Sequence, residues 1–566
     1  MSTQQSQSQI SERFPTPLEK FYENEKRLAS VPCFVQPYPN GRVETLTWAE
    51  QCQQVRSMAA YLKSLNLEPG SRIAIMSSNC AHWIMADFAI WMAGHISVPL
   101  YPILSPNSIR QILEHSDSKV LFVGKLDNWE HMSTGVPESV KQISLPITAA
   151  KVDDKWNDII LRTEPMQESP IRKREDLATI IYTSGTTGMP KGVMHSFATL
   201  ATVGVLTGQL YDANAKDRML SYLPLAHVAE RAAVEINQIY QEFTVYFSNS
   251  LETFADDLRR AEPTLFFAVP RIWVKLQQRV FEQVPEKKLN HLLKIPVVGG
   301  YIRRKLTKAL GMNKVRIGLS GAAPLSTSLL SWYHSIGVPI LEGYAMSENF
   351  AYSHTTQLGE SKIGYVGTTN PHVTCKIASN GEIRIKSPTN MMGYYLEPEL
   401  TAEAFDEEGY LKTGDKGDID AQGRLKITGR IKEIFKTSKG KYVAPAPIED
   451  LLLRNTYLEQ ICVTGADLPQ PIALATLSEQ AVKAASNDPS FREELSQALE
   501  NLIQDTNNQL DQHENISSLV LFKDLWTVEN NFMTPTLKIK RPQIESAYKE
   551  QFENWSTTGD RVLWAD

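Results

Sequence analysis

Residues 179–196 hold the side chains best suited to binding a chain of phosphates. Their sequence, TIIYTSGTTGMPKGVMHS, opens with an apolar, β-branched run at 179–182 that predicts a buried strand. The run breaks into 183–188, where hydroxyls accompany two glycines that free the backbone, and the ammonium of Lys191 follows. The glycine after that lysine, in place of Ser or Thr, departs from the Walker pattern. The segment is a candidate polyphosphate loop; the same composition also occurs in mobile surface loops.

Alternating strand and helix signals in the first third of the chain indicate the elements that would hold this loop. The predicted strands are 72–76, 96–101 and 119–123, followed later by 264–269 and 316–319. An apolar helix is expected at 81–93, and a second helix where Ser105 is placed to cap and Pro106 takes the first helical position. Such alternation predicts a mostly parallel, doubly wound sheet, whose ligands sit at the carboxyl ends of the strands.

Length and composition limit the class of protein. A chain of 566 residues is too long for one core, so two or more domains are expected. The net charge of −6 gives no reason to expect nucleic acid. Five scattered cysteines indicate neither a zinc site nor a disulfide framework, and fit a reducing compartment. The Gln- and Ser-rich first ten residues contain no signal-peptide core, and the apolar stretch 88–104 is interrupted by His95, Pro99 and Pro102. A cytoplasmic protein is therefore expected.

One basic stretch stands out in this acidic chain. Residues 287–316 contain nine Lys or Arg and no Asp or Glu. The stretch is either a solvated helical face or a surface that attracts anionic lipid or a phosphate-bearing substrate, which would make the protein peripherally membrane-associated.

Six motifs in one fixed order carry a resemblance to a known family. They are YTSGTTGMPKGV (182–193), SGAAPLS (320–326), EGYAMSE (342–348), LKTGDKG (411–417), GRIKEIFKTSKGKYVAPAPIE (429–449) and MTPTLKIKR (533–541). Together they resemble the adenylate-forming superfamily, from about residue 45 to residue 541. The segments SYLPLAHVAER (221–231) and VPRIWVKL (269–276) look most like long-chain fatty acyl-CoA synthetases.

This resemblance implies a fold and a reaction. After Gly381 the sequence changes to short strands and turns, and an α+β unit follows. The expected fold class is α/β, with a large N-terminal domain (1–428) of doubly wound sheets and a β-rich subdomain, a hinge at 429–435 and a small mobile α+β domain at 436–566. The reaction would join ATP and a fatty acid into an acyl-adenylate, from which coenzyme A displaces AMP. An acyl-AMP ligase or acyl-carrier-protein synthetase, and a silent acyl-adenylate or lipid sensor, are the alternatives.

Residues that match the family's nucleotide site imply one role each. Those expected around the phosphates are Thr183, Ser184, Gly185, Thr186, Thr187, Lys191 and Ser347. Those expected around adenine are Gly321, Ala322, Ala323, Gly343 and Tyr344, the last by stacking. Asp415 would bind both ribose hydroxyls, because a carboxylate accepts two hydrogen bonds at once, and Arg430 would reinforce contact with ribose or phosphate. Glu348 and Thr186 would hold Mg²⁺, which neutralises charge as pyrophosphate departs.

Five further residues match the family's chemistry and motion. Lys538 would balance charge as carboxylate and α-phosphate meet, with a solvated basic tail as the alternative. His227 would lie beside the acyl carboxylate and Trp273 would gate an acyl tunnel, although a structural histidine and a core tryptophan are the ordinary readings. Lys432 falls at the hinge, because Lys538 must leave before the thiol enters, and the turn at Gly440 would line the pantetheine channel.

Overall fold

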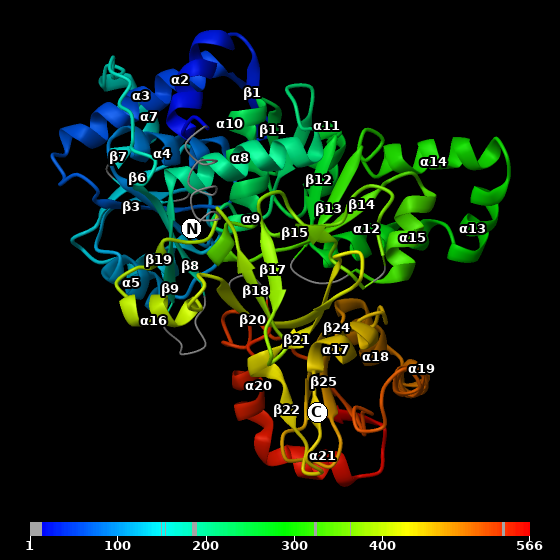
Figure 1. Cartoon of the computed structure of the whole chain (residues 1–566). Helices are drawn as coiled ribbons and strands as arrows, with labels where there is room; N and C mark the ends of the chain where they lie inside the picture. The colour runs from blue at the N-terminus through cyan, green and yellow to red at the C-terminus, as the bar shows by residue number, and fades with distance from the viewer. Residues whose placement is uncertain are drawn as a thin grey trace. The chain divides into compact units, whose positions relative to one another are not determined.

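The computed structural model describes residues 14–148, 150–152, 154–183, 190–321, 325–362, 364–534 and 538–565. Contacts within the chain separate two compact units. The first comprises Met1–Cys375 and Ile385–Leu411, and the second Lys376–Arg384 and Lys412–Asp566. The predicted α/β class is confirmed, since sheets and helices alternate along the first unit and a smaller mixed unit follows (Figure 1).

The first unit is built on a sheet whose eight described strands run in the order β19-β9-β8-β4-β3-β5-β6-β7. In that order their bounds are Gly393–Tyr394, Lys191–Ser196, Leu177–Thr183, Ile96–Leu100, Arg72–Met76, Ser118–Val123, Lys141–Ser144 and Asp154–Lys155. Neighbours from β8 to β7 are parallel, whereas β9 and β19 are added antiparallel. The three strands predicted before residue 125 are all present. Their side chains are mostly buried, which explains why their sequences are largely apolar.

Helices precede this sheet and connect its strands along the chain (Figure 1). They are α2 (Pro17–Arg27), α3 (Trp48–Ser64), α4 (Ala81–Met92), α5 (Pro106–His115), α6 (Trp129–Met132), η1 (Ser133–Gly135), α7 (Trp156–Arg162) and α8 (Phe197–Tyr211). Every residue of α4 is buried, as its mostly apolar sequence predicts, and the buried residues include His82 and Asp87. The predicted cap of α5 is also present: the Ser105 hydroxyl accepts a hydrogen bond from the Ser108 N–H at 3.2 Å, and Pro106 begins the helix.

Two more sheets complete the strand framework of the first unit, in the orders β10-β11-β1-β2 and β12-β13-β14-β15-β16. In chain order their strands are β1 (Pro32–Pro37), β2 (Val43–Thr47), β10 (Arg218–Ser221), β11 (Thr244–Phe247), β12 (Leu265–Ala268), β13 (Ile317–Ser320), β14 (Ile340–Tyr344), β15 (His354–Thr355) and β16 (Thr368–Thr369). The predicted strands at 264–269 and 316–319 correspond to β12 and β13. Strands β12, β13 and β14 are parallel, so their carboxyl ends lie at one edge of the sheet. Gly321, which follows β13, and Gly343, near the end of β14, both lie at this edge.

The remaining helices of this unit connect those strands. They are α9 (Val228–Glu230), the π-helical η2 (Arg231–Ile236), α10 (Asn237–Gln241), α11 (Phe254–Ala261), α12 (Pro270–Gln283), α13 (Glu286–Lys294), α14 (Val298–Ala309), α15 (Thr327–Ser335), η3 (Ser347–Asn349) and α16 (Pro398–Ala404). The basic stretch 287–316 is thus mainly two helices, α13 and α14.

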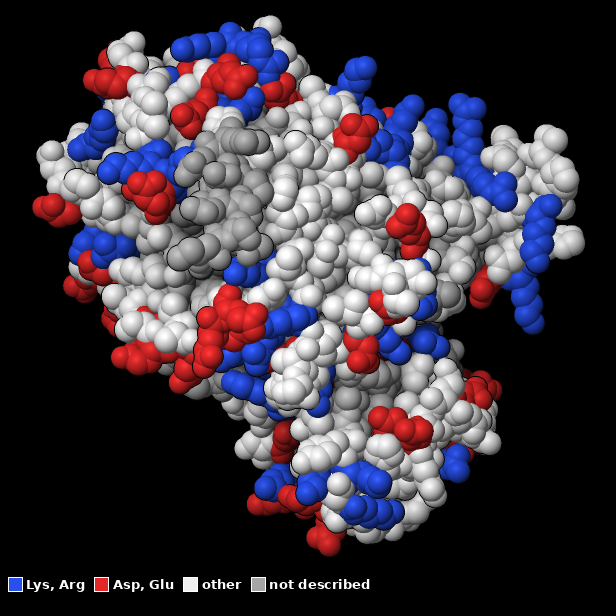
Figure 2. Space-filling view, viewed as in Figure 1, with Lys and Arg blue, Asp and Glu red and all other residues white. Residues whose placement is uncertain are grey.

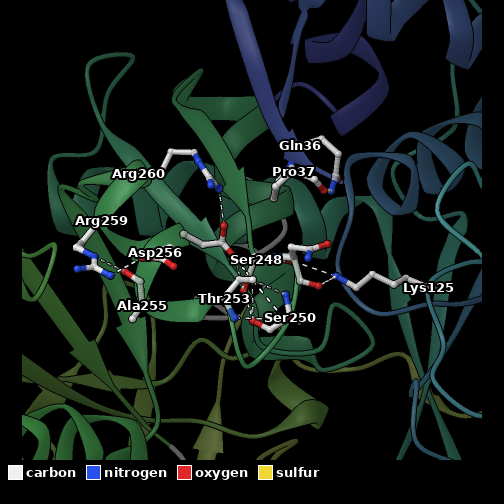
Figure 3. Close-up of polar contacts among 12 residues, drawn as sticks. Gln36, Pro37, Lys125, Ser248, Ser250, Thr253, Ala255, Asp256, Arg259 and Arg260 are labelled. Atoms are coloured by element: carbon white, nitrogen blue, oxygen red, sulfur yellow. Dashed lines mark hydrogen bonds and ion pairs between the residues drawn. The ribbon is translucent and has the colours of Figure 1, made fainter. Parts of the chain in front are cut away.

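A half-buried lysine links the large sheet to the β10–β11 sheet (Figure 3). Lys125 follows β5, and its ammonium donates to the backbone carbonyls of Ser248 and Asn249 at 3.0 and 2.6 Å, directly after β11. The Asp257 carboxylate accepts from the Asn249 N–H at 2.8 Å and from the Thr253 hydroxyl at 2.8 Å, which fixes this loop. The carboxyl ends of β5 and β11 are therefore held close together.

The second unit has its own sheet, β24-β25-β26-β27, and its own cores. Alternate residues of β24 serve two apolar clusters, with Ile461 and Val463 in one and Cys462 in the other, as the two-residue period of a strand requires. The remaining elements after residue 373 are β17 (Thr374–Ile377), β18 (Glu382–Lys386), β20 (Leu411–Ile419), β21 (Leu425–Arg430), η4 (Ile431–Glu433), β22 (Phe435–Lys436), β23 (Tyr442–Val443), α17 (Pro445–Leu452), β24 (Leu458–Thr464), β25 (Ile472–Leu477), α18 (Glu479–Asn487), α19 (Pro489–Asn507), β26 (Leu519–Phe522), α20 (Arg541–Tyr548), η5 (Lys549–Gln551), α21 (Phe552–Thr557) and β27 (Val562–Ala565).

Two further findings bear on location. In the part of the chain that the structure describes, no helix combines the length and apolarity needed to cross a bilayer. All five cysteines are free thiols.

Candidate active site

The two ends of the glycine-rich segment meet in a β-hairpin. Thr183 ends β8, Lys191 begins β9, and the two are paired across the antiparallel ladder. The two described residues that flank the loop therefore lie side by side at the end of β8 and the start of β9. Four residues predicted to hold phosphates, Ser184, Gly185, Thr186 and Thr187, lie outside the described residues.

A tyrosine joins the loop lysine to the predicted metal-binding carboxylate. The Lys191 ammonium lies 5.6 Å from the centroid of the Tyr394 ring, within the range of a cation–π contact. The hydroxyl of the same ring donates a hydrogen bond to Glu348 Oε1 at 2.9 Å. Tyr394 belongs to β19, which pairs with β9 two residues beyond Lys191. Tyr394, which the sequence did not single out, thus contacts both Lys191 and Glu348, and the roles of these two residues at the phosphates and the metal stay predictions.

The segment that contains Ser347 and Glu348 is also fastened to β9 by its backbone. His195 Nε2 donates to the Ser347 carbonyl at 2.8 Å, and the Met391 N–H donates to the Glu348 carbonyl at 2.7 Å. Burial lowers the pKa of His195 to about 3, so the ring is neutral with its proton on Nε2. The first bond fixes the start of η3 on β9, the strand that begins at Lys191, and the second ties it to the residues just before β19.

The expected adenine segment lies where β13 and β14 end. Gly321 follows β13 and Gly343 lies in β14, and a Cβ added to Gly321 would lie 3.4 Å from the Gly343 carbonyl oxygen. Small residues here let the two backbones run close together. Tyr344 ends β14 half-buried, with its ring centroid 6.0 Å from that of His354. Ala322 and Ala323, expected beside them, lie outside the described residues.

Glu342 of β14 has a buried carboxyl group. Glu342 accepts a hydrogen bond from the Leu325 N–H at 3.0 Å, and burial raises the pKa of the Glu342 carboxyl to about 7. The bond ties Leu325 to the strand that ends at Tyr344.

His227 is positioned by its own backbone and by a buried ionic network. It caps α9, and its Nδ1 accepts from the Ala229 N–H at 3.1 Å, which leaves the proton of the neutral ring on Nε2. Four residues on, the fully buried Arg231 pairs with Asp87 of α4 and, at 2.8 Å, with Glu235 of η2. Its guanidinium also donates to the Thr179 hydroxyl of β8 at 2.6 Å. The α9–η2 segment is therefore locked against the large sheet.

Trp273 lies in the core of the first unit. Its side chain is fully buried, its indole N–H donates to the Ala268 carbonyl at 3.1 Å, and its ring packs edge-on against Tyr333 at 4.8 Å. The Tyr333 hydroxyl in turn donates to the Trp273 carbonyl at 2.7 Å. The position fits the core-packing alternative, and gating stays a prediction.

In the second unit, Asp415 and Arg430 are partners across the β20–β21 ladder. The guanidinium Nε lies 3.0 Å from Asp415 Oδ1, and the carboxylate side chain is only 9% exposed whereas the arginine is 55% exposed. The pair brings together the two residues predicted at ribose. It presents a fixed carboxylate beside a partly exposed cation.

The other predicted residues of the second unit lie on turns and short elements. Lys432 is exposed in η4, and its neighbour Glu433 lies 3.8 Å from Arg541. Gly440 takes a positive φ of 78° in the exposed turn between β22 and β23, which suits glycine. Lys538 is exposed, and its carbonyl accepts from the Thr534 N–H at 2.7 Å.

Two family models account for most of this chain. A model described as AMP-binding enzyme matches residues 21–395, and one described as AMP-binding enzyme C-terminal domain matches residues 432–558. The chain belongs to the AMP-binding enzyme family. Family membership makes the protein an adenylate-forming ligase that activates an acyl group and binds ATP and AMP.

Curated relatives in this family match over nearly the whole chain. Long-chain-fatty-acid–CoA ligase FadD15 of Mycobacterium bovis is 29% identical over 559 residues, covering 90% of this chain and 92% of the relative. Long-chain-fatty-acid–CoA ligase 6 of Mus musculus is 28% identical and covers 92% of this chain and 84% of its own.

Solved structures share the family fold. The A domain of the carboxylic acid reductase from Segniliparus rugosus, in complex with AMP and a co-purified carboxylic acid, superposes with a TM-score of 0.79 at 22% identity, covering 95% of this chain and 94% of that one. O-succinylbenzoate coenzyme A synthetase from Bacillus subtilis, in complex with AMP, gives a TM-score of 0.72 at 22% identity, covering 93% and 98%. At these identities the likeness shows the fold.

Sequence reasoning missed several residues that organise the site. They are Tyr394, His195, Glu342 and Arg231. His195 lay within the glycine-rich stretch itself, and Arg231 is flanked by Glu230 and, four residues on, by Glu235, so both offered a signal. Tyr394 offered none, because a two-residue strand has no detectable period.

Proposed function

We propose that the protein activates a long-chain fatty acid and transfers its acyl group to coenzyme A, giving acyl-CoA, AMP and pyrophosphate. In the first step a carboxylate oxygen bonds to the α-phosphorus of ATP, and the bond to the bridging oxygen breaks as pyrophosphate leaves. In the second step the thiol sulfur bonds to the acyl carbon, AMP leaves and the thiol proton is released. Adenylation supplies the leaving group that a carboxylate lacks.

The juxtaposition of Lys191, Tyr394 and Glu348 supports the first step most directly. A cation and a carboxylate beside one glycine-rich loop suit a polyphosphate accompanied by a metal ion, rather than a phosphate alone. Within this proposal Thr183, Ser184, Gly185, Thr186, Thr187 and Ser347 also contact the phosphates. A fatty acid and coenzyme A are supported by the names of the relatives that span the chain.

Magnesium fits the residues present. Glu348 offers a half-buried carboxylate that is oriented by the Tyr394 hydroxyl, and carboxylate and phosphate oxygens are the ligands that Mg²⁺ prefers. The described residues contain no group of three or more Asp, Glu, His or Cys that could hold a metal. The ion would therefore be held by Glu348, the Thr186 hydroxyl and the substrate phosphates. When bound, it would neutralise charge on pyrophosphate.

On the acyl side, His227 would donate from Nε2 to the carboxylate or adenylate oxygen, because Nδ1 already accepts a backbone hydrogen bond. Trp273 would gate the acyl tunnel. Gly321, Ala322, Ala323, Gly343 and Tyr344 would line the adenine.

The second unit would complete both steps. Asp415 would bind the ribose hydroxyls with Arg430 beside it, and Lys538 would balance charge as the acyl-adenylate forms. Rotation at 429–435, around Lys432, would then replace Lys538 by the turn at Gly440. A cytoplasmic location belongs to the same proposal, because all five cysteines are free.

Pyrophosphate release tests the proposal. The protein is given ATP and Mg²⁺ with carboxylic acids from acetate to long saturated chains and aromatic acids, with and without coenzyme A. We expect turnover to peak with long chains and to require coenzyme A. A Glu348→Gln variant, which keeps the Tyr394 partner but loses the charge, serves as the inactive control.

Other outcomes would contradict the proposal in distinct ways. Substantial release without coenzyme A would indicate a different acceptor, such as a carrier protein. A maximum with short or aromatic acids would refute the substrate class. No release with any acid would indicate an acyl-adenylate or lipid sensor.

A further inference from the structure

Helices α13 and α14 form a hairpin, residues 286–309, whose turn exposes an apolar tip, residues 295–301. The tip has the sequence IPVVGGY. Val297 is 91% exposed, Tyr301 69%, and Val298 and Ile295 are also exposed. Exposed apolar side chains are ordinary when scattered, but four on one turn are a contiguous surface that water solvates poorly.

The backbone at the exposed tip is strained. The Val298 N–H donates to the Pro296 carbonyl at 2.8 Å, which closes a three-residue γ-turn. Val297 at its centre has φ 68° and ψ −54°. This conformation is rare for any residue with a Cβ and is least favourable for a β-branched one. Strain of this kind persists where the surrounding structure enforces it.

The two helices that flank this turn are anchored to the first unit. Leu289 and Leu293 are buried in the core of the first unit. The Arg303 guanidinium donates to the Leu293 carbonyl at 3.0 Å and to the Ser335 carbonyl of α15 at 2.7 Å, so it ties both helices to that core. The hairpin is therefore a fixed projection.

Cations surround the tip on both helices, and Figure 2 shows their side chains projecting around α13 and α14. Those exposed on the hairpin are Lys287, Lys288, Lys294, Arg304, Lys305 and Lys308. None of the ion pairs among the described residues involves them. The hairpin has a single acid, Glu286, at its start. In a chain of net charge −6, this surface is locally and strongly positive.

We propose that the hairpin docks on an anionic phospholipid bilayer, with the apolar tip inserted among the headgroups and the flanking cations paired with lipid phosphates. The cations alone would suit any polyanion, including an acidic protein. The tip distinguishes the membrane, because aliphatic side chains gain from leaving water and a tyrosine favours the interface. The proposal does not depend on the acyl acceptor or on the chain length of the substrate.

Vesicle sedimentation tests the charge requirement. The full-length protein should sediment with vesicles of phosphatidylglycerol mixed with phosphatidylcholine, and remain in solution with phosphatidylcholine alone. The triple variant Arg304→Gln/Lys305→Gln/Lys308→Gln should partition roughly 100-fold more weakly, since each cation contributes a factor of about five at an anionic surface. The matched control is Lys63→Gln/Lys151→Gln/Lys216→Gln, three exposed lysines elsewhere in the same unit. Equal retention of the two triple variants would overturn the proposal.

A fluorescent label tests insertion. Val297→Cys carries a polarity-sensitive dye, and Leu161→Cys, at a side chain 86% exposed on α7, is the control. On anionic vesicles the emission at position 297 should shift to the blue while that at 161 stays unchanged. Sedimentation with vesicles but no emission shift at position 297 would mean that the protein binds lipid through another surface. Failure to bind vesicles at all would indicate that the cations contact an acidic protein partner instead. Either result would refute the membrane contact of the tip.

Discussion

Tyr394 shows how one hydroxyl can set the geometry of a predicted metal ligand. It donates to Glu348 Oε1 while its ring lies against the Lys191 ammonium, so it positions both charged groups that the proposal places at the polyphosphate. Because it touches neither reacting atom in this proposal, it is a positioning residue. Removal of the Tyr394 hydroxyl should therefore weaken Mg²⁺ binding more than nucleotide binding.

We expect Tyr394→Phe to raise the Mg²⁺ concentration needed for half-maximal adenylation about 10-fold, because a hydrogen bond to a charged group contributes roughly 1.5 kcal/mol. The KM for ATP at saturating Mg²⁺ should change much less. Titration of ATP–pyrophosphate exchange with Mg²⁺ measures both. The neighbouring Tyr395→Phe is the control, since the Tyr395 ring packs on His115 and its hydroxyl bonds to none of the described residues. Similar effects of the two variants would contradict the positioning role.

Glu342 should make the stability of the first unit depend on pH. Burial raises its pKa to about 7 from an unfolded value near 4.5, so between these values the folded chain holds a proton that the unfolded chain has released. Stability from this group is complete below pH 4.5 and is lost as pH rises through 7. The loss is at most about 3 kcal/mol, from 1.36 kcal/mol per pKa unit.

Glu342→Gln keeps an acceptor for the Leu325 N–H but cannot ionise. Between pH 5 and pH 8 its unfolding free energy should therefore rise relative to that of the parent by up to about 3 kcal/mol. Urea unfolding at the two pH values measures this difference. The exposed Glu68→Gln should show no such change, and a flat difference for Glu342→Gln as well would mean that the carboxyl is not buried in solution.

For individual residues, the sequence motifs identified candidate site residues but not the contacts between them. Lys191, Glu348, Asp415 and Arg430 were identified by motif, and the structure brings each pair together. The connection through Tyr394 depends on the register of β19 against β9, and register over long sequence separation leaves no local pattern.

Among the helices, α8 packs so closely on α10 that position 204 of α8 has no room for a side chain larger than that of glycine. A Cβ added there would lie 2.2 Å from Cδ2 of Tyr240, whose ring is buried and whose hydroxyl donates to the Pro15 carbonyl. The ring therefore has no room to retreat. In α14, by contrast, a Cβ added to Gly300 would meet nothing within 4 Å.

Gly204→Ala should destabilise the protein by about 1–3 kcal/mol, although alanine is the better helix former, because overpacking outweighs propensity. Gly300→Ala should stabilise it by about 0.5–1 kcal/mol, because only propensity changes. Urea unfolding of both variants measures the two signs. Stabilisation by Gly204→Ala would show that the two helices separate easily.

Elements with a strong local signal were predicted well. The strand at 72–76 is apolar and buried after Arg72, and α5 begins with a hydroxyl cap and a proline, so each is encoded within a few residues. The π-helical turn at 231–236 could not be predicted in the same way. It accompanies the buried Arg231, whose partners Asp87 and Thr179 come from distant parts of the chain.

For the whole molecule, the proposed cycle assigns the two reaction steps to different residues of the second unit. Lys538 would act only while carboxylate and α-phosphate meet, and would leave before the thiol arrives. The proposal thus requires that one lysine matter to one half-reaction. Lys540, two residues along, donates from its ammonium to Asn531 Oδ1 at 2.6 Å and so has a structural task within its own unit.

We expect Lys538→Ala to lower the rate of acyl-adenylate formation by about 10²–10³-fold, the usual loss when a group that stabilises developing charge is removed. Thioester formation from supplied acyl-adenylate and coenzyme A should stay within a few-fold of the parent. ATP–pyrophosphate exchange measures the first step and acyl-CoA production the second, with Lys540→Ala as the matched control. Equal loss of both steps in Lys538→Ala would mean that the lysine supports the fold or a shared site. Selective loss in Lys540→Ala would place the adenylation lysine two residues further on. Only a split confined to Lys538 agrees with a second unit that presents different residues to the two steps.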